Sequence, residues 1–152
     1  SMWIYPTEEH SWRCALYVKY ETGFFGMIPI AWEGHSSFRI RDSKEVDGWY
    51  DISGCKLQVN EWSHYVVSYN AKTETAYAYI NGQLVGSMKN VPGNRYAKRI
   101  VLGGDVFQPS FIGKICEVTF YNEIRDHDFV SELHQSYVTR DDFIGFEIGI
   151  DK

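Results

Sequence analysis

The sequence has few cysteines, no excess of basic residues and no long apolar run. It holds 3 cysteines among 152 residues, too few for a disulfide scaffold, and their spacing includes no Cys-x-x-Cys pair of a zinc site. Lys and Arg number 15 against 20 Asp and Glu, without a basic run, which argues against nucleic-acid binding. No apolar stretch approaches the roughly 20 residues of a membrane-spanning helix, so we expect no membrane insertion.

The three cysteines leave two alternatives open. Cys14 and Cys116 both fall in strand-like runs, and one bridge between them is the first alternative. Free buried thiols are the second, because unpaired cysteine behaves as a small apolar residue in many cores. The odd count leaves at least one free thiol in either case.

The chain also lacks any sign of division into parts. Its 152 residues suit one domain that buries a core without cross-links. No linker, internal repeat or low-complexity segment interrupts it, so we expect residues 1–152 to form a single domain. Ser1-Met2 looks like the remnant of a cleaved tag, which predicts a domain cut from a longer protein.

Aromatic residues are abundant, at 16% of the chain, and short runs alternate apolar with polar residues. Aromatic side chains favour strands, and a period of two is typical of a strand with one buried face. The runs expected to form strands are 11–20, 26–34, 36–42, 49–52, 62–70, 73–82, 83–89, 99–104, 111–122 and 142–150. Residues 126–136 are the one good helix candidate, with Asp126 as N-cap and an apolar face of Phe129, Val130 and Leu133.

Two turn signals refine this pattern. Pro29 interrupts the run 26–34 and predicts an edge strand or a bulge, because proline cannot donate to a ladder. Asn81-Gly82 predicts a two-residue hairpin turn, because both residues tolerate a positive φ. Many short strands with one late helix predict an all-β fold, an antiparallel β-sandwich with one short helix near the carboxyl terminus.

The segment EWSHYVVSYN (61–70) raises the question of a catalytic Trp62 and His64. Such a site needs a nucleophile or a metal partner within reach, and the sequence offers none. We therefore expect structural roles, with Trp62 packed at the start of the strand and His64 hydrogen-bonded beside it.

Four ordered segments carry a resemblance to a known family: EWSHYVVSYN, AYAYINGQLVG, RIVLGGD and FIGKICEVTFYNEIRDHDFVSELH. In this order they resemble the laminin-G-like or concanavalin A-like lectin/glucanase superfamily, and most nearly its variant related to pentraxins. The resemblance covers about residues 60–135 and extends weakly to residue 11 through SWRCALYVKY. It implies a concanavalin A-like jelly roll and says much less about activity.

The glucanases of this superfamily raise the question of an enzyme. They carry Glu-x-Asp-x-x-Glu on one strand face, and a retaining pair of carboxyl groups stands about 5–5.5 Å apart. Here Glu45 and Asp47 match the first two acids, but Tyr50 replaces the second Glu and Asp51 points to the opposite face of a strand. We predict that the chain is not an enzyme.

Calcium is the one metal that the resemblance implies, through loop acids at the rim of the sandwich. Asp105 stands after the Leu-Gly strand end, but Val106 and Phe107 follow it where the pattern has acids and amides. Calcium takes six to eight oxygen ligands. Asp105 is thus the first metal candidate, Asp42, Asp47 and Asp51 of another loop are further acids that could contribute, and no other cofactor is expected.

Two segments, AWEGHSSFRIR and DGWYD, mix aromatic with planar polar residues as sugar sites do. A sugar ring stacks its C–H face on an aromatic ring while its hydroxyls pair with polar groups. The candidate binding residues are Trp32, Glu33, His35, Arg39, Arg41, Trp49, Tyr50 and Asp51.

These residues favour a non-catalytic carbohydrate-binding, lectin-like module of a larger secreted or cell-surface protein. The alternative is a protein-interaction, adhesion or structural sandwich without a small ligand. In that case the same aromatic residues only close the ends of the core. The partner is therefore a glycan or a protein.

Overall fold

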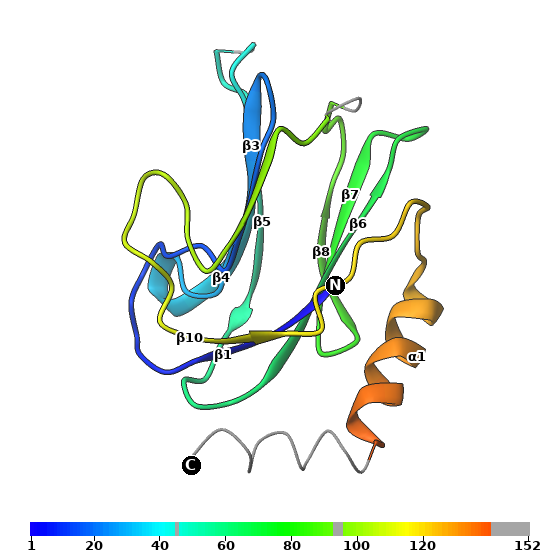
Figure 1. Cartoon of the computed structure of the whole chain (residues 1–152). Helices are drawn as coiled ribbons and strands as arrows, with labels where there is room; N and C mark the ends of the chain where they lie inside the picture. Colours follow the sequence, from blue (N-terminus) through cyan, green and yellow to red (C-terminus); the bar gives the residue numbers. More distant parts are fainter. Residues whose placement is uncertain (45, 93–95, 141–152) are drawn as a thin grey trace.

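The computed structural model describes residues 1–44, 46–92 and 96–140. Two five-stranded antiparallel sheets pack into a sandwich, and one helix, α1 (His127–Val138), follows them (Figure 1). This confirms the predicted all-β sandwich with a short late helix. The strand predicted at 142–150 lies outside the described residues.

The first sheet has the strand order β10-β1-β6-β7-β8, and the second has the order β5-β4-β3-β2-β9. The strands of the first sheet are β1 (Met2–Pro6), β6 (Ser63–Asn70), β7 (Thr75–Ile80), β8 (Gln83–Met88) and β10 (Gly113–Cys116). The strands of the second sheet are β2 (Leu16–Lys19), β3 (Gly23–Ile28), β4 (His35–Asp42), β5 (Trp49–Lys56) and β9 (Arg99–Leu102). A 3₁₀ turn, η1 (Trp32–Gly34), precedes β4.

The main core lies between the sheets and is built mainly from alternate residues of the strands. In the second sheet, one row of cross-strand neighbours that faces the core is Leu102, Leu16, Met27, Phe38 and Ile52. The next such row is Ile100, Val18, Phe25, Ile40 and Tyr50. Except at the edge strand β9, these side chains pack in or against the main core, where each large one stabilises the fold by about 1.5–3 kcal/mol.

Two expectations about the strands of this sheet are wrong. β3 is its central strand rather than an edge, and it ends at Ile28, so Pro29 lies beyond the ladder and removes no bond from it. The run 11–20 pairs as a strand only from Leu16, and its alternation breaks before that point. Cys14 packs with Tyr17 outside the core, whereas Ala15 and Leu16 both lie inside it.

The sequence did not predict β1, the strand between β10 and β6. Met2 and Ile4 are fully buried, and Met2 pairs with Tyr65 of β6. The residue that the sequence suggested to be part of a tag remnant is therefore a core residue of this structure.

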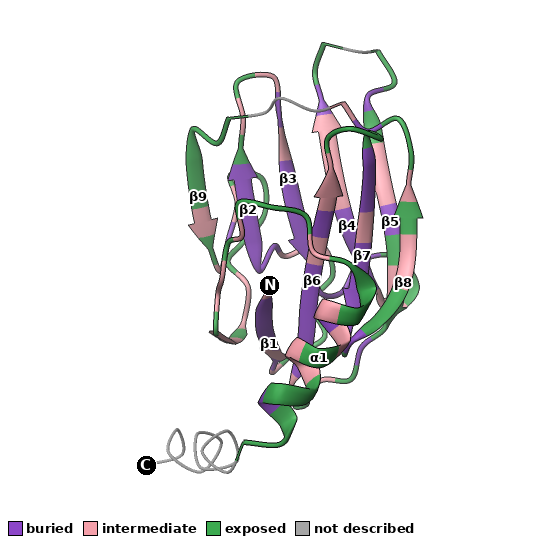
Figure 2. Ribbon diagram, turned by 90° about the vertical axis from the view of Figure 1, so that its right-hand side faces the viewer, coloured by how far each residue is buried: buried purple, intermediate pink, exposed green. Residues whose placement is uncertain are grey.

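The hairpin and the helix form as predicted. Asn81 and Gly82 have φ values of 51° and 77°, which a two-residue hairpin turn requires. The Asp126 side chain accepts a hydrogen bond from the backbone N–H of Phe129 and caps α1. The helix lies over β6 and β7 (Figure 2) and buries Val130 against Val66 and Tyr79.

His64 is fully buried beneath α1, in a stack of rings. Its ring centroid lies 5.0 Å from that of Trp3 and 5.7 Å from that of His134. Neither ring nitrogen has a hydrogen-bond partner within the described part of the chain, so the expected hydrogen bond is absent. Burial lowers the pKa of His64 to about 3, and the imidazole is neutral. Its role is packing, as expected, while Trp62 packs against Tyr5.

All three cysteines are free thiols. The alternative of a bridge between Cys14 and Cys116 is therefore wrong. Within residues 1–44, 46–92 and 96–140, no helix has the length and apolar character needed to cross a bilayer.

Candidate functional site

The outer face of the second sheet carries aromatic and charged side chains that the core does not use. Strand alternation places them there, one residue away from the core rows. One outer row of cross-strand neighbours is Val101, Tyr17, Gly26, Arg39 and Asp51. The adjacent outer row is Arg99, Lys19, Phe24, Arg41 and Trp49.

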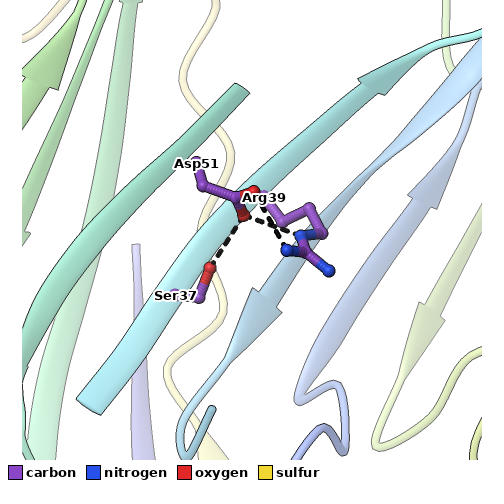
Figure 3. A network of polar contacts seen from close by, with 3 residues as sticks. All are labelled: Ser37, Arg39 and Asp51. Carbon is purple, nitrogen blue, oxygen red and sulfur yellow. Dashed lines mark hydrogen bonds and ion pairs between the residues drawn. The ribbon is translucent and has the colours of Figure 1, made fainter. Parts of the chain in front are cut away.

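An ion pair joins β4 to the edge strand β5 on this face (Figure 3). Arg39 Nε donates to Asp51 Oδ1 at 2.7 Å, and Arg39 Nη2 donates to Asp51 Oδ2 at 3.0 Å. The Ser37 hydroxyl donates to the same Oδ1 at 3.1 Å. The side chains of Arg39 and Asp51 are only 17% and 25% exposed. Such a two-bond pair fixes the plane of the guanidinium.

Three indole rings surround that guanidinium. The Arg39 Cζ atom lies 4.8 Å from the ring centroid of Trp12, 4.7 Å from that of Trp32 and 5.0 Å from that of Trp49. Cation–π attraction of this kind contributes about 0.5–2 kcal/mol per contact. Trp12 and Trp32 also meet edge to face, with centroids 4.4 Å apart. Arg39 therefore holds the three rings in a fixed arrangement.

The cluster leaves two large aromatic surfaces accessible. Trp32 is 55% exposed and Trp49 is 50% exposed, although both contact Arg39. Ordered and accessible indole rings are suited to stacking against the C–H face of a sugar.

Backbone strain accompanies the cluster. Trp12 has φ 68° and Glu33 has φ 52°, a left-handed conformation that costs a bulky residue about 1–3 kcal/mol. A backbone hydrogen bond from Trp12 N to Ile30 O at 2.8 Å helps to hold the first of these. Strain of this kind concentrates at binding sites, where the surrounding structure maintains it.

The structure brings together five of the eight predicted binding residues: Trp32, Arg39, Arg41, Trp49 and Asp51. The Arg41 Cζ atom lies 4.9 Å from the ring centroid of Trp49, and its guanidinium also donates to the carbonyl of Asp42.

The other three predicted residues lie apart from this group. Glu33 belongs to η1 and lines a separate small pocket of about 210 Å³ with Lys56. His35 opens β4 opposite Lys56. Tyr50 lies on the opposite face of β5, in a core row next to Ile40. Neighbouring strand residues point to opposite faces, so Tyr50 cannot share the outer face with Asp51.

Sequence reasoning missed four aromatic residues of the outer face. They are Trp12, Tyr17, Phe24 and Phe107. Phe107 comes from the segment between β9 and β10, is 64% exposed, and packs 5.4 Å from Phe24 and 6.2 Å from Tyr17. A continuous strand over 11–20 would put Trp12 on the same face as Leu16, toward the core. The alternation breaks before β2, and nothing in the sequence signals that break, so the position of Trp12 on the outer face was missed.

Asp105 shapes the segment that carries Phe107. Its Oδ1 accepts backbone N–H groups of Phe107 at 2.6 Å and of Gln108 at 2.7 Å. Together with burial, its carboxylate raises the pKa of the Cys14 thiol. In the part of the chain that the structure describes, no three His, Cys, Asp or Glu side chains cluster as a metal ion would require.

Comparison with known families and structures agrees with this architecture. A family model described as the concanavalin A-like lectin/glucanases superfamily matches residues 1–131. Domain 4 of AbnA, a GH43 extracellular arabinanase from Geobacillus stearothermophilus in complex with arabinotriose, has a TM-score of 0.75 and 23% identity over 88% of this chain and 64% of that domain. This chain thus spans less than two thirds of the length of that domain.

Two further structures share the fold. The CBM40 of the Ruminococcus gnavus IT-sialidase, bound to α2,3-sialyllactose, has a TM-score of 0.70 and 14% identity over 88% of this chain and 79% of the other. A heptameric SAP-like pentraxin from Limulus polyphemus has a TM-score of 0.64 and 16% identity over 88% of this chain and 67% of the other. Among curated proteins, none matches this sequence significantly.

Proposed function

The chain belongs to the concanavalin A-like lectin/glucanase superfamily, and from this premise we propose that it is a non-catalytic carbohydrate-binding module. Its ligand lies on the outer face of the second sheet, against Trp32 and Trp49. The observation that carries the proposal is the cage in which Arg39 orders three indoles while two of them stay half exposed.

The polar centre of the cage complements the stacking surfaces. Asp51 Oδ2 retains one acceptor site beyond its bond to Arg39, and carboxylate and guanidinium groups suit sugar hydroxyls. Because these groups are already fixed, little side-chain entropy is lost when a ligand binds. A site of this design favours an extended glycan that contacts both exposed rings.

We assign no catalytic step to this site. Asp51 serves as the anchor of Arg39, and Tyr50 on the same strand faces the core. The absence of a second carboxylate beside Asp51 on β5 supports a binding role, since glycoside hydrolysis uses a pair of carboxyl groups.

We also propose that the module is part of a larger secreted or surface protein. The support is the context of similar domains: one belongs to an arabinanase described as extracellular, and another is the CBM40 of a sialidase. A module of this kind holds a glycan for its parent protein.

The first experiment is a glycan array on the purified chain, run with calcium and again with EDTA. Calorimetry then follows on the hits, with arabinotriose and α2,3-sialyllactose as the first soluble probes. Trp32→Ala and Trp49→Ala should each weaken binding at least tenfold, about 1.4 kcal/mol, because each removes a stacking surface.

The matched control is Tyr96→Ala, which removes an aromatic ring that is 83% exposed and lies outside both outer rows. It should leave the affinity unchanged. Binding only with calcium would shift the site to the rim around Asp105. No glycan binding in either condition would favour the alternative of a protein-interaction domain.

A further inference from the structure

The charge of the outer face of the second sheet is opposite in sign to that of the whole chain. The sequence carries 20 acidic and 15 basic residues, a net charge of −5. The two outer rows hold four cationic side chains, Arg39, Arg41, Lys19 and Arg99, and a single carboxylate, that of Asp51. Positive charge is thus concentrated on the face that we propose to bind a glycan.

Two of these cations lie side by side at the edge of the sheet away from β5. Lys19 of β2 is directly opposite Arg99 of β9, and both side chains are exposed. Like charges directly opposite each other destabilise an antiparallel pair. Within the described residues neither cation forms an ion pair, and Glu21, two residues after Lys19, lies 4.0 Å from Lys98 instead. A bound anion would relieve the repulsion between the two side chains.

At the other end of the face, Arg39 has a second edge that a ligand can use. A guanidinium has five N–H donors and can hold a carboxylate on its side edge, Nε and Nη2, or on its end edge, Nη1 and Nη2. Asp51 occupies the side edge. Figure 3 shows the remaining nitrogen, Nη1, pointing away from Asp51.

This end edge is accessible to a ligand. Arg39 Nη1 forms no hydrogen bond with the described residues, and it is not among the unpartnered polar atoms that the fold seals from solvent. The half-exposed rings of Trp32 and Trp49 contact the same guanidinium. A sugar that stacks on either ring is therefore within reach of the end edge.

We propose, as an inference that rests on the proposed glycan site, that the ligand is an acidic sugar whose carboxylate binds the end edge of Arg39. The carboxylate accepts from Nη1 and Nη2 in the planar two-bond geometry that Asp51 already shows on the side edge. The sugar ring stacks on Trp32 or Trp49. Arg39 is then the residue that determines specificity, because it both orders the rings and recognises the charge.

The rest of the outer row suits further acidic units of the same oligosaccharide. From Trp49 the row continues through Arg41 and Phe24 to Lys19 and Arg99. Five strands spaced by about 4.8 Å give the row a length of about 19 Å. An oligosaccharide along this row meets cations at both ends and aromatic rings between them.

Calorimetry with matched acids and esters tests the need for charge. One pair of probes is trigalacturonate and its methyl ester, and the other is α2,3-sialyllactose and its methyl ester. The acid should bind at least tenfold more tightly than its ester, and only the affinity for the acid should fall between about 50 and about 500 mM NaCl. The two pairs distinguish a uronic acid from a sialic acid as the source of the carboxylate.

Protein variants separate the geometry of Arg39 from charge alone. Arg39→Lys keeps the positive charge but lacks the planar fork, so it should abolish the preference for the acid. Because this variant also loses the two-bond pair with Asp51, circular dichroism checks its fold. A double variant at exposed positions, Lys19→Ser with Arg99→Ser, gives an independent test. It should weaken binding of the acid at least threefold and leave binding of the ester unchanged.

The matched control removes two positive charges elsewhere. Lys72→Ser with Lys89→Ser changes exposed lysines next to strands of the first sheet and should leave both affinities unchanged. Equal affinity for acid and ester would overturn the acidic ligand, while the proposed carbohydrate-binding function would stand. Binding of no glycan at all would overturn both. Binding of dextran sulfate but of neither carboxylate would also overturn the inference, because charge without the planar carboxylate would then suffice.

Discussion

At the scale of single residues, Arg39 organises the candidate glycan site. It shares an outer row with Gly26, which has no side chain, and with Asp51, which binds its guanidinium in two places. The gap left by Gly26 matters because a Cβ there would lie 3.2 Å from the Cys14 sulfur. A larger residue at position 26 would therefore press on Cys14, which packs with Tyr17.

Asp51→Asn tests whether Arg39 depends on its partner. The change removes the negative charge from a pair that is mostly buried, and we expect the free energy of unfolding to fall by about 1–3 kcal/mol. Glycan affinity should fall as well, because the guanidinium loses its fixed plane between the rings. Urea unfolding and calorimetry measure the two effects.

The matched control is Asp47→Asn, which removes an exposed carboxylate from the turn before β5. Its effect on stability should stay within about 0.5 kcal/mol, as for ordinary surface changes. Equal losses in the two variants would mean that the pair with Arg39 contributes nothing specific.

At the scale of elements, the β7–β8 hairpin connects local turn chemistry to the packing of α1. The Asn81 side chain accepts the backbone N–H of His64 at 2.8 Å, so the turn is tied to β6 as well. Gly82 lies against His134 of the helix. The turn conformation of the Asn-Gly pair therefore also determines how closely the hairpin packs against His134 of α1.

Gly82→Ala should destabilise the chain by about 1–2 kcal/mol. Its φ is 77°, and the new Cβ would approach the His134 side chain to 3.2 Å. Thermal unfolding followed by circular dichroism measures the change in melting temperature.

Gly104→Ala provides the comparison, because its nearest neighbour would be 3.8 Å from the new Cβ and its φ is outside the left-handed region. It should leave the melting temperature nearly unchanged or raise it slightly. A loss at Gly104 as large as that at Gly82 would argue against the left-handed turn as the cause.

At the scale of the whole molecule, the buried His64 couples stability to pH. Its pKa is about 3 in the folded chain, against 6.5 for the unfolded chain. As pH falls below about 6.5, the unfolded chain binds a proton that the folded chain does not, so stability decreases until the pH reaches about 3. Burial lowers the pKa of His134 too, which acts in the same direction.

We therefore expect the free energy of unfolding to be about 1–2 kcal/mol lower at pH 5 than at pH 7, since one such group changes it by up to about 1.4 kcal/mol per pH unit. His64→Phe should reduce this dependence to the smaller contribution of His134, while it keeps a ring against Trp3. Urea unfolding at pH 7, 6 and 5 provides the measurement. His127→Phe, which changes an exposed histidine, should leave the dependence intact, and a flat profile in the parent chain would contradict the explanation.

Much of the fold follows from the sequence because strand alternation, the Asn-Gly turn and the Asp126 cap are local signals. They predicted most of the paired strands, the hairpin and α1. β1 escaped prediction, because its five residues, MWIYP, are nearly all buried and show no alternation. A strand that is covered on both faces loses its period of two.

For the candidate site, the sequence by itself determined which residue types are available and on which strand faces most of them stand. Arg39, Arg41, Trp49 and Asp51 follow from alternation along two neighbouring strands. The same alternation places Tyr50 on the opposite face, toward the core. Only the tertiary structure decided that Trp12, Phe24 and Phe107 join the site. The break in alternation before β2 places Trp12, the pairing of β3 with β4 places Phe24 beside Arg41, and the segment between β9 and β10 brings in Phe107. These are contacts between distant segments, which no local pattern encodes.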